Sequence, residues 1–116
     1  MLQEQELLNL YVKKGLIIDN TEIIVFKEYC LDYIQSSKQL NLCILGIDGY
    51  ILENNTIKVN LFETYDFSKS KKNIQNCYSL AEQCISNLQD KGKSDGYIFT
   101  FDDKSTLSYL QPSQSS

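Results

Sequence analysis

Three side chains in this sequence are of types that could together perform a reaction. Asp102 and Lys104 form an Asp-x-Lys pattern at the end of the apolar run YIFTF, and Asp48 follows another apolar run. Two carboxylates at strand ends can hold a magnesium ion while a lysine stabilises the charge that develops on a phosphate. This set would suit a magnesium-dependent nuclease. Against it, Asp48 is distant from Asp102 in the sequence, and the net charge of -4 disfavours binding to nucleic acid.

Other common catalytic and metal-binding residues are missing. There is no His, and all 11 basic residues are Lys. The usual general base and the bidentate donor for phosphate or guanine are therefore both absent. The four cysteines, Cys30, Cys43, Cys77 and Cys84, form no C-x-x-C pair, and we expect their thiols to be reduced. We interpret Cys30, Cys77 and Cys84 as small buried apolar residues on helix faces. We expect no catalytic residue, no metal site, no cofactor and no direct binding of nucleic acid.

Carboxylates and tyrosines occur together at the expected strand ends and loops. Such a surface suits a basic protein partner, because carboxylates attract it from a distance and tyrosines add contact area at modest entropic cost. The same residues could instead cover the edge of the core and keep the protein soluble. Tyr65 and Tyr97 are the expected anchors of the contact. The full set of expected binding residues is Tyr50, Glu53, Glu63, Tyr65, Asp66, Asp95, Tyr97, Asp102 and Asp103.

One α+β domain must position these residues. We expect it to span residues 1–116, with a frayed polar tail at 111–116, because a chain of 116 residues has no room for two cores. Apolar spacing predicts a helix over residues 2–14 and a second helix over residues 19–37, which begins at a capping box. The clearest helical pattern starts after Asp66 and ends at Gly92. About three helices are therefore expected.

About three strands complete the predicted fold: a hairpin and one crossover strand. The runs LCILGIDGYIL and TIKVNLFETYDF flank Asn54–Asn55. If these asparagines form a two-residue turn, Tyr50 faces Val59, and Gly49 indicates a bulge beyond this pair. The run YIFTF follows the long helix, so it should be parallel to the second strand, with the first strand between them. Helices then cover one face of the sheet, and the other face is solvated or covered by a partner.

The segment LGIDGYILENNTIKVNLFETYDFS, the long helix after it and the final SDGYIFTFDD resemble a small immunity protein of bacterial polymorphic toxin systems, notably contact-dependent growth inhibition. The resemblance extends over about residues 42–103, and the small size, acidic charge and Asn, Lys, Ile and Tyr content agree with it. It implies a cytoplasmic antidote that binds a cognate toxin domain and blocks its active site or substrate surface. Many such toxins are basic nucleases, which would suit an acidic partner without Arg.

We therefore expect a non-enzymatic protein that neutralises a basic toxin domain in the cytoplasm. The first residues lack a basic region followed by an apolar stretch, and no apolar run approaches the roughly 20 residues that span a bilayer, so neither a signal peptide nor a membrane segment is expected. Two alternatives stay open: the magnesium-dependent nuclease with Asp48, Asp102 and Lys104, and an adaptor or regulator from a mobile element. The oligomeric state is left open as well.

Overall fold

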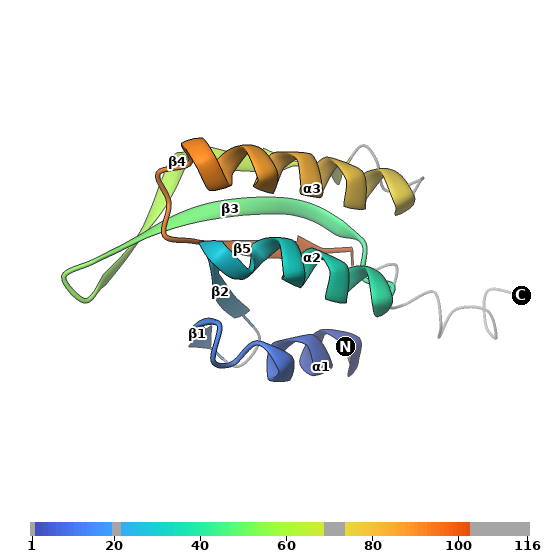
Figure 1. Cartoon of the computed structure of the whole chain (residues 1–116). Coiled ribbons are helices and arrows are strands. Elements are labelled where there is room, and N and C mark those ends of the chain that lie inside the picture. Colours follow the sequence, from blue (N-terminus) through green and yellow to red (C-terminus); the bar gives the residue numbers. More distant parts are fainter. Residues whose placement is uncertain (1, 20–21, 69–73, 103–116) are drawn as a thin grey trace, which may run out of the picture.

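The computed structural model describes residues 2–19, 22–68 and 74–102 (Figure 1). The elements are α1 (Leu2–Leu10), β1 (Gly15–Asp19), β2 (Glu22–Phe26), the 3-10 turn η1 (Lys27–Tyr29), α2 (Cys30–Gln39), β3 (Ile44–Glu53), β4 (Thr56–Asp66), α3 (Ile74–Lys91) and β5 (Gly96–Phe101). The expected α+β class is confirmed. The sheet has five strands in place of the three that were predicted.

The carboxyl-terminal part of the sheet matches the prediction. The strand order is β1-β2-β5-β3-β4, and β3 is antiparallel to both of its neighbours, so β4 and β5 run in the same direction on either side of it. Asn54 and Asn55 have φ values of 50° and 64°, as a tight two-residue hairpin turn requires. Tyr50 faces Val59, and the register shifts between Asp48 and Gly49, where a bulge was expected.

The amino-terminal part corrects the prediction. The first part of the helix predicted over residues 19–37 is strand β2 instead, which forms a hairpin with β1 and joins the sheet through Val25 opposite Tyr97. Helix α2 begins only at Cys30, and α1 ends at Leu10 instead of residue 14. The reason is the run EIIVF, whose β-branched residues favour a strand. In a run this short, helical and extended periods fit the same apolar positions.

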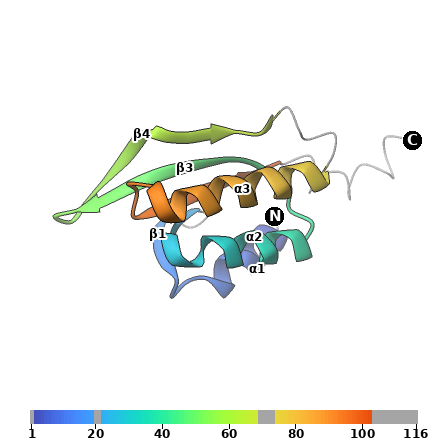
Figure 2. The same ribbon diagram turned by 45° about the horizontal axis from the view of Figure 1, so that its top comes forward.

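All three helices lie on one face of the sheet (Figure 2), and the core is between them and the strands. Strands β2, β3 and β5 supply most of its strand residues, among them Val25, Ile47 and Phe99, whereas β1 supplies none. In the described ranges no helix covers the opposite face. This agrees with the prediction that the helices pack on one face of the sheet. The tip of the β3–β4 hairpin projects beyond the helices (Figure 1). No helix in the described ranges is long and apolar enough to cross a membrane.

Candidate functional site

Edge strand β4 departs from regular pairing at the bulge. Gly49 of β3 faces Asn60, whereas the preceding Asp48 faces Thr64, so the three residues Leu61–Glu63 have no partner on β3. Asn60 and Glu63 are buried, while Leu61 is 76% and Phe62 is 95% exposed. The extra residues therefore turn two polar side chains into the protein and two large apolar side chains out of it.

Glu63 is held by four hydrogen bonds from the segment between α3 and β5. Its Oε2 accepts from the Lys93 amide at 2.7 Å. Its Oε1 accepts from the Ser94 amide at 3.1 Å, the Ser94 hydroxyl at 2.6 Å and the Tyr97 hydroxyl at 3.0 Å. Burial alone would raise the pKa of Glu63, but these donors together lower it below the usual value. The carboxylate is therefore charged at neutral pH and fully satisfied.

Asn60 completes this clamp from the other end of the bulge. Its Nδ2 donates to the Ser94 hydroxyl at 3.1 Å, and its Oδ1 accepts from the Phe62 amide at 3.1 Å. Gly49 makes room for the arrangement, since a Cβ at this position would collide with the Ser94 hydroxyl. Asn60, Glu63 and Ser94 thus form a buried clamp, and we use this name for the three residues below. It fixes the bulge, and with it the outward direction of Leu61 and Phe62.

The outer surface of β4 is apolar along much of its length. Ile57 and Val59 precede the bulge and are also exposed. β4 is also an edge strand: no strand in the described part of the chain pairs with its free edge. That edge therefore presents unpaired backbone donors and acceptors. Among carboxylates, exposed Glu53 stands beside the start of β4, and exposed Asp66 is its last residue. We call Ile57, Val59, Leu61 and Phe62 the β4 strip.

The expected binding residues do not gather at one place. Asp95 is exposed and accepts a hydrogen bond from the Leu52 amide at 2.7 Å. Tyr50 is half-buried on the helix-free face, whereas half-buried Tyr65 packs against the core. Asp102 is buried and its amide donates to the Cys43 carbonyl at 2.9 Å. Asp103 lies outside the described residues.

Two members of the expected binding set are directed inward. Tyr97 is fully buried and Glu63 is buried, so each is part of the interior and neither is an outward contact. The β4 strip was not anticipated. Its signal in the sequence is the pair Leu61-Phe62, two consecutive apolar residues that break the alternation of β4 between polar Asn60 and Glu63.

The nuclease set is not assembled by the described residues. Asp48 faces Ile98 in the middle of the sheet, and Asp102 follows four residues later along β5, which is roughly 13 Å of extended chain. Lys104 lies outside the described residues. Within these ranges no three His, Cys, Asp or Glu side chains are grouped to hold a metal. Burial raises the pKa of the Cys43 thiol to about 12 and also raises that of Cys30, so these thiols are protonated at neutral pH.

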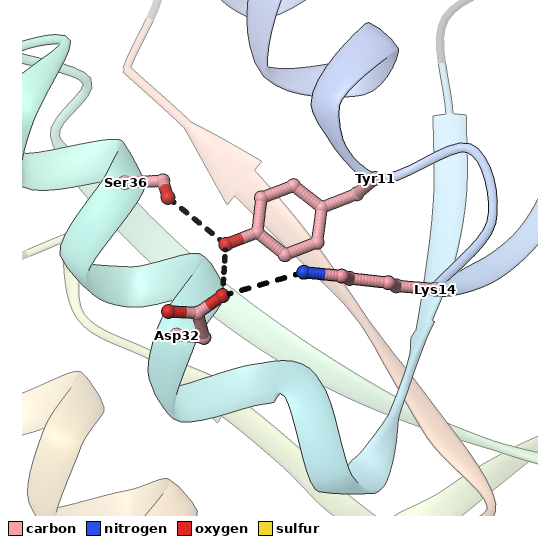
Figure 3. A network of polar contacts seen from close by, with 4 residues as sticks. All are labelled: Tyr11, Lys14, Asp32 and Ser36. Atoms are coloured by element: carbon pink, nitrogen blue, oxygen red, sulfur yellow. Dashed lines mark hydrogen bonds and ion pairs between the residues drawn. The ribbon is translucent and has the colours of Figure 1, made fainter.

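A separate polar network ties the turn that follows α1 to α2 (Figure 3). The Tyr11 hydroxyl donates to Asp32 Oδ2 at 2.9 Å and shares a second hydrogen bond of 2.9 Å with the Ser36 hydroxyl. Lys14 Nζ is 3.8 Å from the same Asp32 oxygen. Burial raises the pKa of Tyr11 to about 12, opposed by the Ser36 hydrogen bond and assisted by Asp32. This tyrosine is therefore a neutral structural donor.

No protein-family model matches the chain, and a comparison with curated proteins finds no match.

Proposed function

We propose that this protein is a non-enzymatic antidote that binds and neutralises a basic toxin domain in the cytoplasm, and that the β4 strip is its contact surface. The single observation that supports this contact surface is that Leu61 and Phe62 are exposed while the clamp residues beside them are buried. The partner class rests on the resemblance over about residues 42–103, a segment that includes β4.

The position of Phe62 favours a binding role over a packing role. Burying a phenylalanine side chain stabilises a protein by roughly 2 kcal/mol, and this one is 95% exposed in the unbound chain. Its direction is set by a charged, fully hydrogen-bonded Glu63. A partner that covers Phe62 and Leu61 would gain the burial energy without any change in the clamp, which is how rigid interface anchors work.

The charge around the β4 strip suits a basic partner. The exposed carboxylates of Glu53 and Asp66 flank β4, and Lys58 is its single cationic residue. The chain as a whole carries a net charge of -4. Long-range attraction would therefore increase the association rate with a basic domain, and the apolar strip would slow dissociation.

The test is to identify any toxin domain encoded beside this gene, and to measure co-expression and binding with it. Phe62→Ala is expected to weaken binding by about 2 kcal/mol, roughly 30-fold. The matched pair is Leu61→Ala against Leu10→Ala, because Leu10 is equally apolar and 58% exposed, but on α1. Only Leu61→Ala should weaken binding and reduce protection of growth.

Two results would count against different parts of the proposal. If no toxin domain binds and growth is not protected, the antidote function is lost, and capture of a stable partner that is no toxin would favour the adaptor or regulator alternative. If a toxin binds but Leu61→Ala and Phe62→Ala behave like Leu10→Ala, the function survives and the β4 strip is the wrong surface.

A further inference from the structure

A cavity lies between β2 and β5. It is separate from the β4 strip, because β4 is at the edge of the sheet and β3 lies between β4 and β5. Strands β2 and β5 pair only at Val25–Tyr97 and Phe26–Gly96. Beyond these pairs the strands part, and with residues of α1 and α2 they enclose a cavity of about 270 Å³. Glu22 of β2 and Phe99 of β5 line it, at positions where continued pairing would have closed the sheet.

The cavity combines carboxylates with aromatic rings. Glu4 of α1 and Glu22 of β2 supply the carboxylates, and Tyr33, Phe99 and Phe101 supply the rings. Neither glutamate forms a hydrogen bond or an ion pair with any residue in the described ranges. No Lys is among the described residues that line the cavity. Its charge is therefore negative and uncompensated from within these ranges.

Tyr33 gives a second and independent indication that the cavity can bind a polar ligand. Its side chain is only 4% exposed, and its ring packs against Phe99 at 4.8 Å and Tyr11 at 5.0 Å between centroids. Its hydroxyl forms no hydrogen bond with a described residue and is not sealed from solvent, so it is open to a polar group in the cavity. Burial, and after it the Glu4 carboxylate, raises the pKa of Tyr33, so the hydroxyl is neutral and lies near Glu4 at the cavity.

We propose that this cavity binds the head of an organic cation, a guanidinium or alkylammonium group. Glu4 and Glu22 would neutralise its charge, the Tyr33 hydroxyl would accept one of its N–H donors, and the aromatic rings would contact it as they contact cations elsewhere. The volume is just below the roughly 300 Å³ at which pockets for drug-sized ligands begin. It therefore has room for one cationic head with its first methylene groups.

The cation has two possible sources with the same chemistry: a free small molecule, or an arginine or lysine side chain of a protein partner. The site does not depend on the antidote function. It is built by α1, α2, β2 and β5, and none of its described residues belongs to β4. Variants of the cavity and variants of the β4 strip can therefore fail separately.

The test is a titration of the full chain with n-butylguanidinium, followed by NMR of the isoleucine methyl groups. Ile23 and Ile98 line the cavity and report on its occupancy. The control probe is n-butylurea at matched ionic strength, because it has nearly the same shape and no charge. The methyl signals are expected to shift with n-butylguanidinium and not with n-butylurea.

Substitutions then identify the groups responsible. The double change Glu4→Gln and Glu22→Gln is expected to weaken n-butylguanidinium binding at least fivefold, while the charge-matched control Glu6→Gln with Glu28→Gln leaves it unchanged. Tyr33→Phe keeps the ring and should weaken binding by about two- to tenfold. An unchanged dispersion of methyl signals verifies folding, and Tyr33→Phe provides the test if the double variant fails to fold.

Two results would overturn the cation site: equal shifts with n-butylurea, or equal affinities for the cavity variants and their controls. If the site holds, the same double variant distinguishes the sources. Weaker binding of the toxin domain by Glu4→Gln with Glu22→Gln, beyond that of the control pair, identifies a side chain of the partner. Unchanged toxin binding identifies a free cation.

Discussion

Tyrosine and glutamate side chains lie together at two places in this molecule, the clamp and the cavity, and the two places differ in hydrogen bonding. At the clamp, Glu63 accepts hydrogen bonds from Tyr97, Ser94 and the Lys93 amide. At the cavity, Tyr33 lies near Glu4 and Glu22, and none of the three has a hydrogen-bond partner in the described ranges. The difference is the supply of donors: the segment before β5 provides them to Glu63, and no described segment provides them at the cavity.

This comparison separates structural polar groups from groups available to a ligand. A carboxylate with four internal donors stabilises the fold, and changing it should change stability. A carboxylate or hydroxyl without internal partners contributes little to stability, and changing it should affect binding alone. The following four predictions test this separation.

The largest effect is expected for Glu63→Gln. Glutamine has one acceptor where Glu63 has two, and its amide group would face donors, so buried N–H and O–H groups lose their partner. We expect the free energy of unfolding to fall by about 2–4 kcal/mol in urea titrations. Glu53→Gln, at an exposed position beside the hairpin turn, is the control and should change it by less than about 0.5 kcal/mol. Equal effects of the two variants would contradict the structural role of the clamp.

A smaller effect on the free energy of unfolding is expected for the neighbouring tyrosines Tyr11 and Tyr33. Removing the hydroxyl should destabilise the protein at Tyr11 and not at Tyr33. Tyr11→Phe loses the hydrogen bonds with Asp32 and Ser36, and should lower the free energy of unfolding by about 1 kcal/mol. Tyr33→Phe removes a hydroxyl without a described partner and should leave stability unchanged or slightly higher. Thermal or urea unfolding of both variants gives the comparison. A larger loss for Tyr33→Phe would mean that its hydroxyl is already satisfied.

The clamp also predicts a dependence of stability on pH. The pKa of Glu63 is lowered in the folded protein because its hydrogen bonds outweigh burial. The unfolded chain takes up this proton near the ordinary glutamate pKa of about 4.3. Stability from Glu63 is therefore complete above that pH and is lost as pH falls through the lower folded pKa. Asp48 has the opposite sign, because burial raises its pKa, so its contribution is present at low pH and lost as pH rises.

Urea midpoints measured between about pH 3 and about pH 7 would show these two contributions. Glu63→Gln should flatten the loss of stability on acidification. Asp48→Asn should make that loss steeper and should raise stability at neutral pH. Parallel pH profiles for the wild-type protein and Glu63→Gln would show that the clamp does not hold a charged carboxylate.

The smallest effect on folding is expected for Phe62→Ala. Its side chain is 95% exposed, so the free energy of unfolding should change by less than about 0.5 kcal/mol. The same variant is expected to have a large effect on toxin binding. A substantial loss of stability would indicate that Phe62 packs within the chain, and it would no longer qualify as a contact anchor.

The sequence alone was sufficient where the signals are local. The turn at Asn54–Asn55 follows from two residues that tolerate positive φ. Helix α3 follows from an apolar period of sufficient length, and β5 follows from the alternating aromatic residues of YIFTF after Gly92 has ended the helix. The prediction failed at residues 22–26, where the run is too short for its period to distinguish strand from helix. The availability of β5 as a pairing partner, far away in the sequence, decided in favour of the strand.

The candidate sites depended on tertiary structure for the same reason. Composition determined what is absent from the chain, namely His and Arg, and determined its net negative charge. Whether Glu63 is a surface acid or a buried anchor depends on Lys93, Ser94 and Tyr97, which reach it only when α3 returns the chain to the sheet. The outward position of Phe62 follows from that contact. Long-range contacts of this kind are not encoded in local periodicity, because each residue's neighbours in the sequence are the same whether or not the contact forms.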